Sequence, residues 1–185
     1  MMRYFYLTAI LLALVIAAGT LISPNPARAA SAAETSSDAK SALEKLYAKS
    51  PKAKTLGEQA KGILVFPGIA KAGFLVGGQY GEGALIKDGN TAGYYNTVQL
   101  SYGFQAGIQK YGYALFLMTD SAMKWIDKSD GWEIGTGPSI TVMDIGAAES
   151  FTTTTLQSEI YAFFFDQKGL MGGIGLQGTK ITKIK

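Results

Sequence analysis

The chain has 185 residues, with 17 basic and 14 acidic side chains and neither histidine nor cysteine. These two absences exclude serine–histidine triads, thiol nucleophiles and zinc sites built from histidine or cysteine. They also exclude disulfides. An enzyme would have to work with carboxylates, lysines or tyrosines alone, so we predict a non-enzymatic protein without a cofactor or a metal.

The N-terminus has the pattern of a secretory signal peptide. An apolar run over residues 4–22 follows Arg3, and Ala27-Arg28-Ala29 comes after two prolines. A charged start, an apolar run and a small-x-small site predict that residues 1–29 are removed. The run is also long enough to remain as a membrane anchor, which is the competing interpretation. Both interpretations predict a periplasmic or otherwise exported protein.

Arginine occurs only at Arg3 and Arg28, both inside the predicted signal peptide. The rest of the chain therefore lacks the planar guanidinium that reads phosphate and guanine through paired hydrogen bonds. Its lysines are nearly balanced by acids, which leaves no broad basic surface. Nucleic-acid binding is not expected.

Residues 30–37 are small and polar and are expected to form a flexible leader. Apolar residues then recur at helical spacing, which predicts an amphipathic helix capped by Ser36 or Ser37. Ser50-Pro51 ends this helix and begins a second one, because proline suits the first helical position and serine the cap before it. A helical pair is thus expected over residues 38–61. The apolar positions of its first helix are Ala39, Ala42, Leu43, Leu46 and Tyr47.

Beyond Gly62 the chain consists of short runs rich in β-branched and aromatic residues, separated by glycines, which predicts antiparallel strands. Asp88-Gly89-Asn90 is typical of a hairpin turn. Phe163-Phe164-Phe165 must place rings on both faces of its strand, so we expect a sheet covered on both sides. The expected strands are 62–67, 72–79, 82–88, 92–97, 99–108, 111–118, 138–144, 158–166, 170–177 and 179–184.

One short helix is expected between the strands, with Asp120 as its cap. It would run through Ala122, Met123, Trp125 and Ile126. The predicted fold class is α+β, with an N-terminal helical pair packed on a mostly antiparallel, strongly curved or barrel-like sheet rich in glycine.

The glycines of residues 73–83 have two interpretations. A phosphate-binding loop requires a helix after the glycines, and here a strand follows, which argues against a nucleotide site. Gly73, Gly77, Gly81 and Gly83 are instead spaced to share one face of paired strands. Such a patch would admit either a helix of the protein itself or an acyl chain.

Asp127, Asp130 and Glu133 are the carboxylates closest together in sequence. A pair of acids is what glycoside hydrolysis uses, but nothing in the sequence orders these three. A calcium loop would need more ligands and a distal glutamate. We therefore expect caps and solvated surface at these positions.

Lysines crowd the predicted helical pair and accompany its apolar stripe. A basic amphipathic segment of this kind lies on anionic membranes, with each lysine near the surface contributing about 1 kcal/mol. The alternative is that the stripe packs on the sheet and the lysines are simply solvated. Composition alone leaves both open.

Four segments together carry a family resemblance. AKGILVFPGIAKAGFLVGGQYGEGAL, GYALFLMTDSAMKWI, GPSITV and YAFFFDQKGLMGGIGLQGTKI occur in this order. The chain from residue 38 to residue 185 resembles the SYLF domain family, a lipid-binding domain. The resemblance implies that a basic amphipathic segment before the glycine-rich strands binds lipid. The matching positions are Lys40, Lys45, Lys49, Lys52, Lys54, Leu43, Leu46 and Tyr47.

The resulting prediction is an exported lipid- or membrane-binding protein that engages anionic phospholipid or lipopolysaccharide headgroups. Protein partners in the envelope are left open. A small outer-membrane β-barrel or an envelope structural protein is the alternative, because glycine, tyrosine and alternating strands suit it. An enzyme that uses carboxylates or lysine alone is a third hypothesis.

Overall fold

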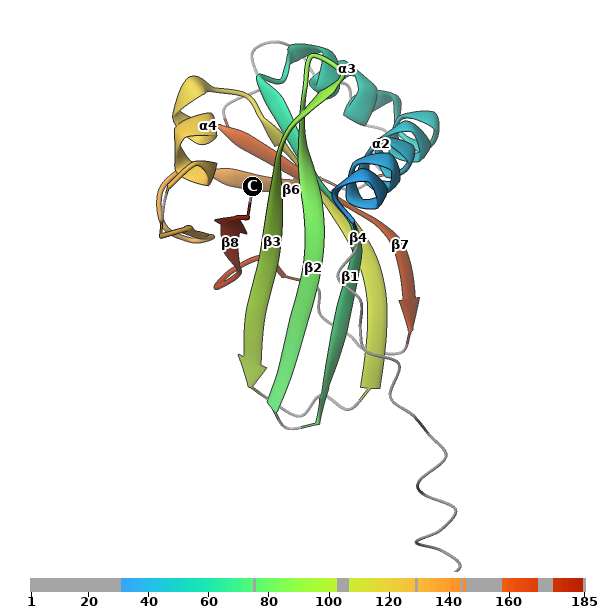
Figure 1. Cartoon of the computed structure of the whole chain (residues 1–185), viewed down its shortest axis with the longest axis vertical. Coiled ribbons are helices and arrows are strands. Elements are labelled where there is room, and N and C mark those ends of the chain that lie inside the picture. The colour runs from blue at the N-terminus through green and yellow to red at the C-terminus, as the bar shows by residue number, and fades with distance from the viewer. Residues whose placement is uncertain are drawn as a thin grey trace, which may run out of the picture.

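The computed structural model describes residues 31–74, 76–102, 107–128, 130–143, 145, 158–169 and 175–184. The predicted signal peptide lies outside these residues. Two helices come first and a sheet follows, as predicted, so the α+β class is confirmed (Figure 1). None of the described helices combines the length and the apolar character needed to cross a bilayer.

Helix α2 spans Ala32–Lys49 and begins with a capping box. The Ser31 amide donates to Glu34 Oε2 at 2.8 Å, and the Glu34 amide donates to Ser31 Oγ at 3.2 Å. This cap starts the helix earlier than expected, so residues 32–37 are helical and the prediction of a flexible leader there was wrong. Neither Ser36 nor Ser37 is the cap. Ser36 Oγ instead lies 2.6 Å from Thr91 Oγ1 of the sheet.

Helix α3 spans Pro51–Gln59, and the expected break at Ser50-Pro51 is confirmed. The buried Ser50 side chain accepts a hydrogen bond from the Ala53 amide at 3.3 Å. Helix α4 spans Asp120–Ile126. Its cap is Thr119, whose hydroxyl accepts from the Ala122 amide at 3.1 Å, and not Asp120 as predicted.

Within the described residues the strands form one eight-stranded sheet in the order β5-β8-β3-β2-β1-β4-β7-β6. Every pairing is antiparallel except β6 with β7. The sheet is strongly curled into a half-barrel. The strands are β1 (Gly62–Phe74), β2 (Val76–Lys87), β3 (Asn90–Tyr102), β4 (Gly107–Leu117), β5 (Trp132–Glu133), β6 (Ile140–Met143), β7 (Ile160–Gly169) and β8 (Lys180–Lys183).

The strands are longer than predicted because glycine and proline were interpreted as turns. Residues 68–71, expected to separate two strands, belong to β1, where Phe66 and Pro67 stand opposite Gly83 as a bulge. The predicted break at residue 98 also lies inside β3, where Val98 pairs in regular register with Tyr80. The turn at Asp88-Gly89 is confirmed, with φ of 50° and 75°. Much of the expected strand 170–177 lies outside the described residues, and residues 177–178 form a turn.

Each face of the sheet has its own core. The outer face packs against α2 and α3 through residues such as Val65, Ala84 and Phe163. The inner, concave face packs against α4 and the region of β5 and β8 through Phe66, Tyr113 and others. Phe163 and Phe165 belong to the outer core and Phe164 packs on the inner one, which confirms a sheet covered on both sides.

The glycine patch lies on the inner face, and side chains of the neighbouring strand fill it at Gly81 and Gly83. A Cβ at Gly81 would lie 2.3 Å from Ile69 Cδ1, and one at Gly83 would lie 2.6 Å from Phe66 Cδ1. These glycines give room to Ile69 and Phe66, whereas α2 and α3 pack on the other face. No helix of the described residues occupies the patch.

We expect Gly83→Ala to lower the free energy of unfolding by about 1–3 kcal/mol, because its Cβ would also lie 2.4 Å from the Val65 carbonyl oxygen. Gly68→Ala in the adjacent strand is the matched control, since nothing lies within 4 Å of that Cβ. Urea denaturation measures both. Equal stability of the two variants would contradict this account of the patch.

Candidate functional site

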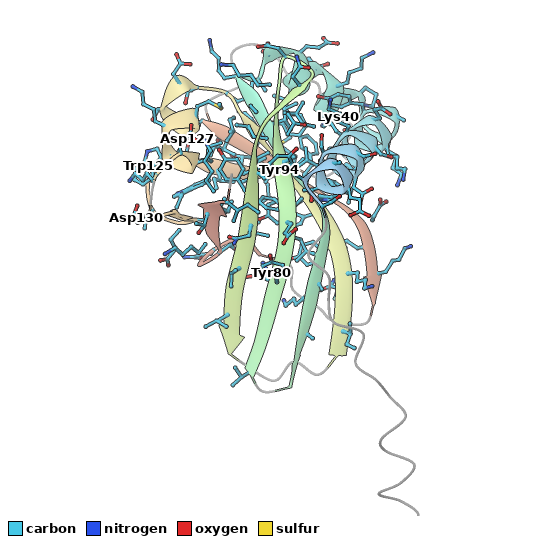
Figure 2. The ribbon with its side chains drawn as sticks, in the orientation of Figure 1. Lys40, Tyr80, Tyr94, Trp125, Asp127 and Asp130 are labelled. Atoms are coloured by element: carbon cyan, nitrogen blue, oxygen red, sulfur yellow. The ribbon has the colours of Figure 1, made fainter. Side chains whose placement is uncertain are left out.

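The lysines of the helical pair lie at its surface, as the basic-segment hypothesis requires. Lys45, Lys49 and Lys54 are exposed, and Lys40 and Lys52 are partly exposed. Figure 2 labels Lys40 on α2. Because α2 and α3 cover the outer face of the sheet, their free sides carry this charge away from the core.

Two of the five lysines have partners. Lys49 Nζ lies 3.0 Å from Asp166 Oδ1, and about half of each side chain is exposed. An exposed pair of this kind contributes little stability, but it ties the end of α2 to β7. Lys52 also interacts within the protein.

The three apolar residues of the predicted lipid site face the sheet. Leu43 and Leu46 are 7% and 1% exposed and belong to the outer core. The ring of Tyr47 packs with its centroid 6.4 Å from that of Phe116. The structure therefore places Lys45, Lys49 and Lys54 at the surface, whereas Leu43 and Leu46 are buried against the sheet; Lys40 is partly exposed and, at helical spacing, lies on the same side of α2 as Tyr47.

The carboxylates form no ordered group. Asp127 Oδ1 accepts hydrogen bonds from Tyr95 Oη at 2.9 Å and from Lys183 Nζ at 2.7 Å, which fastens α4 to β3 and β8. The hydrogen bond from Lys183 lowers the pKa of Asp127 from its ordinary value. Asp130 and Glu133 are exposed beside a shallow pocket. Among the described residues, no three acidic side chains stand close enough to hold a metal ion.

Polar side chains form a row across the inner face, below the apolar core. Gln99, Gln79, Lys71 and Gln109 are neighbours in register on β3, β2, β1 and β4. Lys71, Gln79 and Gln109 are almost completely buried. We call these four residues the inner polar row.

Two buried tyrosines adjoin the inner polar row. Tyr111 Oη donates to Gln79 Oε1 at 2.5 Å, and Tyr113 Oη donates to Thr97 Oγ1 at 2.7 Å. Burial raises the pKa of Tyr111 to about 12 and holds that of Tyr113 well above the ordinary value. Both phenols therefore stay protonated near neutral pH and act as hydrogen-bond donors, which makes them poor general bases.

The strand segments that carry the inner polar row have an apolar, exposed outer face. Its side chains come from the ends of β1 to β4 that lie below the helices (Figure 1). Sequence reasoning missed this surface, although alternation in Gln79-Tyr80, Gln99-Leu100 and Ile108-Gln109 was a usable signal. We call it the outer apolar face; its described residues are Ala70, Ala72, Val76, Gly78, Tyr80, Val98, Leu100 and Ile108.

The fold is thus that of an α+β protein in which a basic helical pair covers half of a curled sheet. Residues 98–185 match the family model Ysc84, described as Las17-binding protein actin regulator. This is the SYLF domain family, which is associated with lipid binding and is generally non-catalytic. No protein with a curated description matches the chain.

We expect Leu46→Ala to lower the free energy of unfolding by about 2–5 kcal/mol, because it leaves a cavity between α2 and the sheet. Lys45→Ala next to it should change stability by less than about 0.5 kcal/mol. Thermal or urea denaturation of both variants is the measurement. A fully stable Leu46→Ala protein would show that the apolar stripe is not part of the core.

Asp127→Asn should lower stability by about 0.5–1 kcal/mol at neutral pH, since the affected pair is partly exposed. The pKa of Asp127 is lowered in the folded state, so its contribution is present above the unfolded pKa of about 3.9. This contribution to stability is lost as the pH falls through the lower pKa that Asp127 has in the folded state. Urea denaturation near pH 7 and pH 3 should therefore give a smaller difference at pH 3, with Asp130→Asn as the control.

Proposed function

We propose that the protein is an exported, non-enzymatic module that binds anionic membrane surfaces. Phospholipid headgroups and lipopolysaccharide phosphates share the negative charge that lysines attract. The observation that supports this most directly is the exposure of Lys45 and Lys54, with the partial exposure of Lys40, on a helical pair whose apolar stripe is already used in the core. The match of residues 98–185 to a family associated with lipid binding supports it independently.

The proposed contact is electrostatic and peripheral. Because Leu43 and Leu46 are buried against the sheet, the helical pair has no free apolar stripe to sink into lipid. Each lysine held near an anionic surface contributes about 1 kcal/mol, and this attraction fades beyond about 10 Å at moderate ionic strength. The helical pair alone should therefore give weak, salt-sensitive binding.

The export proposal rests on the N-terminal sequence pattern. The family description names Las17 and actin. An exported chain would meet neither of them, so we do not extend those partners to this protein. Envelope lipids are the partner that the proposed location and the lysines have in common.

The test compares two triple variants of equal charge loss. Lys40, Lys45 and Lys54 are replaced by Gln in one, and Lys124, Lys128 and Lys180, around α4 and β8, in the other. Flotation with vesicles of phosphatidylglycerol and phosphatidylcholine, at low and high salt, measures binding. We expect the first variant to lose the low-salt binding several-fold and the second to keep it.

A parallel measurement with lipopolysaccharide distinguishes the two anionic surfaces. Equal loss in both triple variants would mean that only net charge matters. Unchanged binding in the first variant would overturn the role of the helical pair.

A further inference from the structure

The residues of the outer apolar face form ordered rows across four strands. Leu100, Gly78, Ala72 and Ile108 are neighbours in register on β3, β2, β1 and β4. Val98, Tyr80, Ala70 and Lys110 form the next row toward the helices. On β2 and β4 the residues of both rows are an even number of positions from Ala84 and Ala114, which belong to the outer core. Because side chains alternate along a strand, both rows lie on the outer face.

The side chains of these rows are exposed to an unusual degree. Leu100 is 66% and Ile108 is 70% exposed, and Val76, at the end of β2, is 57% exposed. Single exposed apolar residues are ordinary on protein surfaces, but a contiguous patch marks a contact site. Neither α2 nor α3 covers these residues, because the helices pack on the other half of the strands (Figure 1).

At this end of the sheet the polar side chains lie on the inner face and the apolar side chains lie on the outer face. The inner polar row lies directly behind the outer apolar face on the same strand segments, and its Lys71, Gln79 and Gln109 are buried. Water-facing sheets show the opposite arrangement, with apolar residues inside. Apolar side chains outside and polar side chains inside suit strands whose outer surface meets hydrocarbon.

The next row along the strands, toward the helices, contains a side chain of the kind that is found at the level of lipid headgroups. Tyr80 is 49% exposed and donates from its hydroxyl to Glu82 Oε1 at 2.7 Å, so its ring is apolar and its tip polar. Figure 2 labels Tyr80 on β2 below the helices. Tyrosine and lysine gather at headgroup level in membrane proteins.

Positive charge flanks the apolar rows on one side. Lys110 ends the Tyr80 row and pairs in register with Lys168 of β7, and both side chains are exposed. Two lysines opposite each other repel, unless an anion lies between or beside them. An anionic headgroup supplies that charge while the neighbouring acyl chains cover the apolar rows.

We infer that the outer apolar face, at the ends of β1 to β4, inserts into the acyl layer of an anionic membrane, with Tyr80, Lys110 and Lys168 at the headgroups. This inference rests on the proposed binding to anionic membranes and adds a second, hydrophobic contact to it. From Val76 to Tyr80 the strand rises about 13 Å, which is more than the depth of about 5–10 Å that interfacial helices reach, so with Tyr80 at the headgroups Val76 would lie in the acyl layer.

The absence of cysteine allows a fluorescent reporter to be placed at a single position. An environment-sensitive dye is attached to Leu100→Cys, Asn96→Cys or Val142→Cys in the protein as the cell exports it. Val142 is exposed on β6, away from the outer apolar face, and serves as the matched control. Vesicles of phosphatidylglycerol and phosphatidylcholine are added, and flotation of the same samples measures total binding.

We expect the emission at position 100 to rise several-fold and shift to the blue, with a smaller change at 96 and none at 142. Nitroxide lipids labelled along the acyl chain should quench position 100 more than position 96. Leu100→Ser with Ile108→Ser should lose the salt-resistant part of binding, whereas Val142→Ser with Ile184→Ser keeps it.

Two results would overturn the inference while leaving the proposed function intact. One is unchanged emission at position 100 in protein that floats with the vesicles. The other is an emission rise that follows protein concentration without vesicles, which would make the face a contact between copies of the chain. Absence of flotation altogether would instead reject binding to these anionic membranes, and the insertion with it.

Discussion

The strands β1 to β4 extend beyond the helices that pack on them, and most features of the molecule follow from this unequal coverage. Side chains alternate between the two faces of a strand, so each strand must meet a different environment in each half. Under α2 and α3 both faces are apolar, because both are buried in cores. Beyond the helices the outer face is apolar and exposed, and the inner face is polar.

Several tyrosine and aspartate side chains form hydrogen bonds that hold the fold together. Tyr111 and Tyr113 remain protonated and donate to Gln79 and Thr97 on neighbouring strands. Asp127 is held by Tyr95 and Lys183 and fastens α4 to the sheet. These hydrogen bonds join strands of the sheet to one another and α4 to the sheet.

The two proposed contacts act over different distances. Lysines attract an anionic surface from about 10 Å away, whereas apolar burial acts only on contact and is little affected by salt. Both belong to the same side of the sheet, because α2 packs on the outer face. In the proposed arrangement the helical lysines attract the membrane and the outer apolar face adds the part of binding that resists salt.

The sequence by itself determined the helical pair, the break at Ser50-Pro51, the turn at Asp88-Gly89, the α+β class and the family. These depend on local spacing, capping and motif order, which a linear pattern records. It did not determine where long strands continue, since Pro67 and Gly68 are compatible with a turn as well as with a bulge. Nor could it decide that Leu46 faces the core while Leu100 faces outward. The spacing and composition of a segment predict which residues share a face. Only tertiary packing decides which face is covered, because covering requires a second element that the rest of the chain places there.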